Sequence, residues 1–159
     1  IYTLSLHDAL PILAYKTFNS SMQRVLKNFT TRGGALMVSG AYIGRDNMNS
    51  SDNKFLANTL KCEYAGRNMI SADYLNGMGT TIPYWRQLNE EHYAATSSDI
   101  LQPVKPAYTA LQYADGYGAG VAYQGSDYRS FVMGIPFECI KGEQKRAAIM
   151  NGILNFLLK

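Results

Sequence analysis

The stretch that most constrains the fold is residues 33–44, with the sequence GGALMVSGAYIG. A helical pattern of apolar residues runs into its two leading glycines, and a second helical pattern follows it. A short apolar run between glycines is typical of a parallel strand buried on both faces, with a loop at its carboxyl end where ligands bind in open α/β sheets. We therefore expect a central strand at residues 35–39 and a polar loop at 40–49.

The patterns on either side of this strand predict helices. Apolar residues recur on one helical face over residues 17–32, and the glycine pair 33–34 provides a stop. A second helix is expected from residue 50 or 51 to about 64, and a third from about 142 to 158. The order helix, strand, loop, helix is that of one half of a doubly wound sheet.

Towards the carboxyl end, the pattern of apolar residues changes to the period of strands. Residues 108–113, 119–124 and 128–135 predict three strands joined by tight turns rich in glycine and aspartate, which is an antiparallel β-meander. Shorter strands are expected within 80–88, where Pro83 favours an edge position, and at 100–104.

Four segments together resemble a known family. They are Tyr15-Lys16-Thr17-Phe18, GGALMVSGAYIGRD at 33–46, GAGVAYQGSDYRSFVMGIPFE at 118–138 and the closing helix. The chain resembles the class I glutamine-amidotransferase-like (flavodoxin-like) domain of secreted bacterial proteins of the xanthan lyase or golvesin-C-terminal-like-domain type. The resemblance implies an α/β fold with a three-layer, flavodoxin-like, Rossmann-like core, a meander as an antiparallel extension, and a single domain over 13–159 that is truncated at its amino end.

The resemblance also bears on catalysis. Active relatives carry a nucleophilic cysteine in a G-x-C-x-G elbow, and Tyr42 stands in that place within Gly40-Ala41-Tyr42-Ile43-Gly44. A tyrosine with a pKa near 10 stays protonated and is no substitute for a thiolate. The His-x-Glu of the family is also absent from residues 134–138. The resemblance thus implies a non-catalytic accessory domain of a secreted, extracellular, periplasmic or cell-surface protein, which supports neighbouring domains or binds a glycan or peptide. The alternative is a polysaccharide-degrading lyase or hydrolase.

The candidate ligand residues follow from the expected strand ends. The carboxyl edge of the central strand would present Ser39, Gly40, Tyr42 and Asp46, and the last strand leads to Glu138. Asp46 and Glu138 would suit acid–base chemistry if they lay about 5–10 Å apart. Tyr84 and Trp85 belong to an expected aromatic platform for sugars; the alternative for these rings is cross-strand packing or burial against a neighbouring domain. The other members of that platform are Tyr93, Tyr108, Tyr113, Tyr117 and Tyr123.

No metal or cofactor is expected. His92 lies in a polar stretch, and its two glutamate neighbours are adjacent in sequence, which rarely lets side chains converge on one ion. Cys62 and Cys139 lack a CxxC spacing, so zinc is not indicated; they would form one disulfide or remain as buried thiols.

Composition disfavours other partners. The net charge is +3, and no basic block is longer than Lys145-Arg146, which argues against nucleic-acid binding. No run of about 18 apolar residues exists, so membrane insertion is not expected.

The first twelve residues, IYTLSLHDALPI, stand apart from the rest. They lack a basic start and a small-residue cleavage site, so they are a poor signal peptide. They resemble a translated sequencing-adapter peptide, and on that interpretation they are not native and contribute nothing to the fold. The sheet would then lack its first strand and present an open edge.

Overall fold

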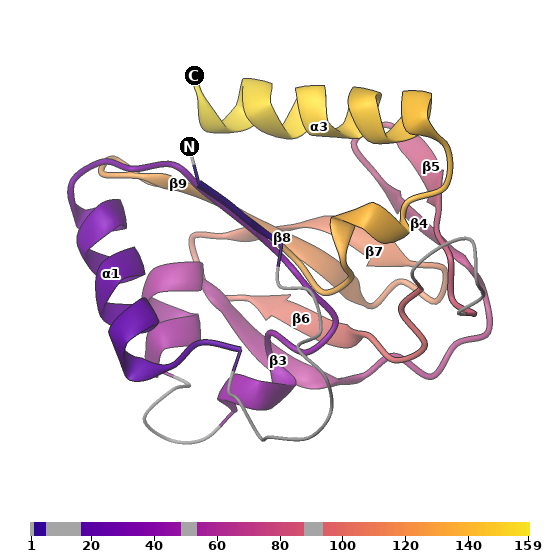
Figure 1. Cartoon of the computed structure of the whole chain (residues 1–159), viewed down its shortest axis with the longest axis horizontal. Coiled ribbons are helices and arrows are strands. Elements are labelled where there is room, and N and C mark those ends of the chain that lie inside the picture. The colour runs from indigo at the N-terminus through magenta and orange to yellow at the C-terminus, as the bar shows by residue number, and fades with distance from the viewer. Residues whose placement is uncertain (1, 6–16, 49–53, 88–93) are drawn as a thin grey trace.

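The computed structural model describes residues 2–5, 17–48, 54–87 and 94–159. Their main feature is a seven-stranded mixed sheet in the order β1-β2-β9-β8-β7-β4-β5 (Figure 1). Its strands are β1 (Tyr2–Ser5), β2 (Leu36–Ser39), β4 (Tyr74–Gly77), β5 (Thr80–Pro83), β7 (Tyr108–Tyr113), β8 (Gly118–Gln124) and β9 (Arg129–Met133). A separate antiparallel pair joins β3 (Cys62–Arg67) to β6 (Asp99–Pro103).

β9 connects two kinds of strand pairing. It is parallel to β2, with Leu36 opposite Ser130, and antiparallel to β8, with Val121 opposite Val132. β7, β8 and β9 form the predicted meander, and β4 and β5 extend it as an antiparallel hairpin beside β7. The parallel part of the described sheet is therefore confined to β1, β2 and β9.

The expected three-layer flavodoxin-like, Rossmann-like core is wrong. Most strand pairs in the described sheet are antiparallel, and strands outnumber α-helices there. The α-helices described are α1 (Ser20–Thr31) and α3 (Glu143–Leu157). The expected helix reaching residue 64 is instead a π-helical turn, η2 (Leu56–Leu60), followed by β3; the start expected at residue 50 or 51 lies outside the described residues. Lys61 takes a left-handed conformation (φ 59°), which ends the turn and redirects the chain into the strand.

Two apolar clusters cover the two faces of the sheet. On one face, Leu26 of α1 and Leu56 of η2 pack with Leu101 of β6 against Val38 and Val132. On the other face, Ile149, Ile153 and Leu157 of α3 pack against Met37 and Phe131. All four residues of β2 are buried, as the sequence predicted for a strand covered on both sides.

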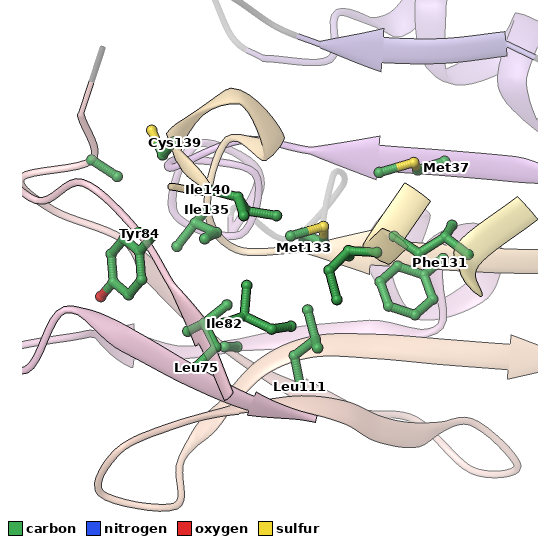
Figure 2. Packing of buried hydrophobic residues seen from close by; sticks show 14 of the residues in the cluster. Met37, Leu75, Ile82, Tyr84, Leu111, Phe131, Met133, Ile135, Cys139 and Ile140 are labelled. Atoms are coloured by element: carbon green, nitrogen blue, oxygen red, sulfur yellow. The ribbon is translucent and has the colours of Figure 1, made fainter. Parts of the chain in front are cut away.

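The second cluster extends into the antiparallel half of the sheet. Figure 2 shows Met37, Phe131 and Met133 facing the same apolar space as Leu75, Ile82 and Leu111. In Figure 1, β4 and β5 rise towards α3, and the turn between them carries Met78, whose side chain reaches Gly152 of that helix. The sheet thus curls around α3.

β1 lies in the segment that we interpreted as non-native. It pairs in parallel with β2, with Tyr2 opposite Leu36 and Ser5 opposite Ser39, and so occupies the edge that we expected to be open. Residues 6–12 of that segment lie outside the described residues. None of the helices described here has the length and apolar character needed to cross a bilayer.

Candidate functional site

The carboxyl ends of β2 and β9 bring several predicted residues together. Ser39 ends β2, and its Oγ accepts a hydrogen bond of 3.3 Å from the backbone N–H of Phe137. Phe137 begins the short helix η3 (Phe137–Cys139), which carries Glu138. The N–H of Gly40 donates to the carbonyl of Met133 at the end of β9. Ser39, Gly40 and the segment with Glu138 therefore share one edge of the sheet.

The loop after β2 holds Tyr42 and Asp46 in internal contacts. The guanidinium carbon of Arg45 lies 3.9 Å from the centre of the Tyr42 ring, a distance typical of a cation–π contact. Asp46 lies in the 3₁₀ turn η1 (Arg45–Asn47), and its Oδ2 accepts a 2.6 Å hydrogen bond from the hydroxyl of Thr17. The contact between Arg45 and Tyr42 lies within the loop, and the hydrogen bond from Thr17 joins the loop to the residues just before α1.

Asp99 is the residue at this edge that sequence reasoning missed. It begins β6, its exposed fraction is 2%, and its Oδ2 accepts hydrogen bonds from the backbone N–H groups of Gly44 (2.6 Å) and Arg45 (3.1 Å). Gly44 permits this approach, since a Cβ there would lie 2.9 Å from the Tyr64 ring and 3.2 Å from the carboxylate. Asp99 thus anchors the start of η1 to a strand 54 residues further along the chain.

The backbone of Asp99 is held as firmly as its side chain. Its N–H donates to the carbonyl of Gly134, and its carbonyl accepts a 2.7 Å hydrogen bond from the hydroxyl of Tyr113.

Burial raises the pKa of the Asp99 carboxyl to about 7, although the two amide donors and Arg45 act to lower it. The only sequence signal was a polar Ser97-Ser98-Asp99 run before an apolar strand, which is equally typical of a solvated loop.

Tyr84 and Trp85 occupy different environments. Tyr84 is fully buried, and burial raises the pKa of its hydroxyl. Figure 2 shows its ring beside Ile135 and Ile82 in the core. Trp85 is 36% exposed, its backbone N–H donates to the carbonyl of Cys139, and the ammonium of Lys141 lies 4.5 Å from its ring centre. Lys141 also pairs with Asp73. Of the two residues, only Trp85 therefore reaches the surface, next to η3.

The other proposed platform tyrosines do not gather into one surface. Tyr113 is buried, and Tyr108 is half-exposed with its ring edge-on to Phe156 at 6.5 Å. The Tyr123 ring packs at 4.9 Å against that of Tyr128, with Lys61 over it. Tyr93 and His92 lie outside the described residues. Tyr108 thus contacts α3, Tyr113 is buried in the core, and Tyr123 packs on Tyr128.

Two cavities lie away from this edge. A cleft of about 550 Å³ lies at the amino ends of β2 and β9, lined by the turn at 125–128, by Gly33 and Gly34, and by the end of α3. A groove of about 720 Å³ runs along α1 past Met22 and Val25. Within the described ranges, no group of three or more histidine, cysteine or acidic side chains is placed to hold a metal ion.

Both cysteines are buried thiols and form no disulfide. Cys62 begins β3, and burial raises its pKa to about 12, so its reactive thiolate form is scarce at neutral pH. We expect a disulfide-exchange reagent such as Ellman's reagent to react with neither thiol in the native chain and with both in denaturant. A thiol titrated within the mixing time in native buffer would contradict this.

Comparisons with known proteins find structures of similar fold but no family to which the chain can be assigned. No family model matches the chain, and no curated protein matches it. Among solved structures, a catalytic mutant of Gan42B, a GH42 β-galactosidase from G. stearothermophilus, matches with a TM-score of 0.60 and 12% identity, covering 86% of this chain and 19% of that one. The exo-β-1,4-mannosidase Op5Man5 from Opitutaceae bacterium strain TAV5 matches with a TM-score of 0.58 and 9% identity, covering 87% of this chain and 23% of that one.

A third match is the N-terminal domain of mmIFT52, with a TM-score of 0.54, 16% identity, and coverage of 89% of this chain and 72% of that one. The chain thus spans about a fifth of the two glycoside hydrolases that it resembles. The expected glutamine-amidotransferase-like resemblance is wrong, because these neighbours are parts of glycoside hydrolases and an IFT52 domain. At such identities the likeness concerns the fold alone.

Proposed function

We propose that this chain is a non-catalytic, carbohydrate-associated accessory domain of a larger, secreted bacterial protein. Two lines of support are combined. The fold resembles a segment that makes up about a fifth of a β-galactosidase and of a mannosidase. The side chains of Ser39, Asp46 and Asp99 at the carboxyl edge of the sheet accept hydrogen bonds from other parts of the chain.

The hydrogen bonds of these polar side chains support the non-catalytic part of the proposal. The Asp99 carboxylate binds two backbone amides, Ser39 accepts from the N–H of Phe137, and Asp46 accepts from Thr17. A carboxylate that serves as acid or base must reach the proton that it transfers. Side chains used in this way support a scaffolding role towards neighbouring domains, with glycan contact through exposed groups such as Trp85 at the border of η3.

The alternative is a polysaccharide-degrading lyase or hydrolase in which Asp46 and Glu138 would act. Such a mechanism needs the two carboxyl groups on either side of one glycosidic bond. The hydrogen bond from Thr17 to Asp46 instead directs that carboxylate to the start of α1. The two functions make different predictions for the same purified chain.

Glycan binding without turnover is the expected outcome for the 159-residue chain. Calorimetry against galacto-, manno- and xanthan-derived oligosaccharides should detect binding, and Trp85→Ala should weaken it about tenfold or more because the ring supplies a stacking surface. Tyr117→Ala is a matched control, since Tyr117 is 58% exposed in the turn between β7 and β8.

Turnover is measured in parallel by the release of reducing ends or of nitrophenol from aryl β-galactosides and β-mannosides. Release that is lost in Asp46→Asn or Glu138→Gln would establish the alternative and overturn the proposal. Absence of binding to every glycan in the panel would refute the carbohydrate association.

A further inference from the structure

Two buried polar atoms lie near each other just beyond the ends of β3 and β5. The hydroxyl of Tyr84 and the Nδ2 amide of Asn68 have no hydrogen-bond partner among the described residues, although these residues are only 0% and 3% exposed. Burial raises the pKa of Tyr84, while Ser98 and Asn68 act to lower it, so both side chains lie close to its hydroxyl. Buried polar groups in native proteins nearly always have a partner, so two such atoms side by side point to a shared one.

The orientation of the Asn68 amide is fixed by its neighbours. Its backbone N–H donates to the carbonyl of Ser98 at 2.8 Å, and its Oδ1 accepts a 3.1 Å hydrogen bond from the N–H of Ile70. Turning the amide over would place Nδ2 against the N–H of Ile70, with two donors facing each other. The atom of Asn68 that lacks a partner is therefore a donor.

Two tyrosines reach the same place from the seven-stranded sheet. Figure 2 shows the oxygen of Tyr84 pointing away from Ile135 and the apolar cluster. The hydroxyl of Tyr113 donates to the carbonyl of Asp99, which follows Ser98 in the chain. Burial raises the pKa of Tyr113 as well, and Ser98 acts to lower it, so Ser98 lies close to both hydroxyls. The polar groups thus gather where the β3–β6 pair meets the seven-stranded sheet.

We propose that Tyr84 and Asn68 bind one ordered internal water molecule, which joins the β3–β6 pair to the end of β5. The water accepts from Nδ2 of Asn68 and shares a hydrogen bond with the Tyr84 hydroxyl, which can both donate and accept. The hydroxyl of Ser98 provides a third polar partner, and buried waters make about three hydrogen bonds on average. The inference goes beyond the proposed function and does not depend on glycan binding.

A water molecule suits these groups better than an ion does. A cation would be repelled by the Nδ2 donor of Asn68, and the described residues contain no cluster of acidic, histidine or cysteine side chains for a metal. An anion would lie near negative charge, because Asp73 and Asp99 act to raise the pKa of Tyr84 and Tyr113 respectively. A neutral molecule that both accepts and donates meets neither obstacle.

A high-resolution crystal structure of the full chain tests for the water directly. It should show a density peak about 2.7–3.2 Å from both the Tyr84 hydroxyl oxygen and Nδ2 of Asn68. Absence of such a peak, or a direct hydrogen bond between the two side chains, would overturn the proposal. Crystals grown in bromide identify the occupant, since an anomalous signal at the peak would show a halide and overturn the assignment to water.

Stability in solution gives a second, independent test, because Tyr84→Phe removes the hydroxyl and keeps the ring. If the hydroxyl binds a water, its loss should raise the unfolding equilibrium constant in urea about 2- to 10-fold, as for other hydrogen bonds. A hydroxyl buried without any partner would have the opposite effect, since its removal relieves a desolvated group. A Tyr84→Phe variant as stable as the wild type, or more stable, would therefore overturn the proposal.

Two further variants calibrate that measurement. Tyr113→Phe loses a direct hydrogen bond to the carbonyl of Asp99 and shows the size of such a loss in this part of the core. Tyr117→Phe is the matched control, because Tyr117 is 58% exposed and should unfold as the wild type does.

Discussion

Replacing Gly118 by alanine is expected to lower the free energy of unfolding by about 3 kcal/mol, the upper end of the usual range for overpacking a core. A Cβ on Gly118 would lie 2.1 Å from the carbonyl oxygen of Leu101. The obstacle is backbone of β6, which cannot turn aside as a side chain can, so the two sheets would have to separate. Urea denaturation followed by Trp85 fluorescence measures the change.

Gly134 and Gly152 provide comparisons for this variant. Gly134→Ala should have a similar effect, because its Cβ would lie 2.5 Å from the carbonyl oxygen of Asp99. Gly152→Ala is the matched control: its Cβ meets only the flexible end of Met78, and alanine gains about 1 kcal/mol over glycine inside a helix. Equal stabilities of Gly118→Ala and wild type would show that β6 does not pack this closely on β8.

The stability of the wild-type chain is expected to fall by about 3 kcal/mol between pH 5 and pH 8 because of Asp99, at about 1.4 kcal/mol for each pKa unit. The folded chain raises the pKa of this carboxyl from 3.8 to about 7, so it binds a proton more tightly than the unfolded chain does. The contribution of Asp99 to stability is thus full below about pH 4 and is lost as the pH rises through 7. Urea denaturation at several pH values measures this slope.

Asp99→Asn isolates the group responsible. The amide oxygen of asparagine still accepts from Gly44 and Arg45, but it has no charge to bury, so this part of the pH dependence should vanish. Asp99→Ala should be less stable than Asp99→Asn at every pH, since the buried N–H of Gly44 and the partly buried N–H of Arg45 lose their acceptor, at about 1–3 kcal/mol for the buried group. A wild type and Asp99→Asn with the same slope of stability against pH would refute the assignment.

Several elements could be predicted from local sequence patterns. β2 and its loop, the meander β7-β8-β9 and helix α3 each depend on periodicity and turn residues that are close together in the chain. The segment 54–67 was misjudged because its helical pattern is real for only one turn: Lys61 then adopts φ 59°, and Cys62–Arg67 pair with β6. Local propensity was overridden there by pairing with a strand far along the chain.

Among the predicted site residues, some also depend on local sequence and others on contacts far along the chain. Ser39 and Gly40 follow from the end of β2, a local feature, and Trp85 was chosen for its residue type. The burial of Tyr84 and the anchoring role of Asp99 depend on which strands pack over them. An aspartate in a Ser-Ser-Asp run looks the same in a sequence whether water or two backbone amides surround it.

The sequence by itself determined where the chain turns, which residues of β2 are apolar on both faces, and where the last helix lies, because these depend on neighbours a few residues away. Only the tertiary structure decided that β9 joins the parallel part of one sheet to its antiparallel part, that β6 crosses β8 over Gly118, and that Asp99 is buried beside Gly44. Strand pairing, close backbone approach and loss of hydration each join residues far apart in the chain, and their energies exist only once those residues have met.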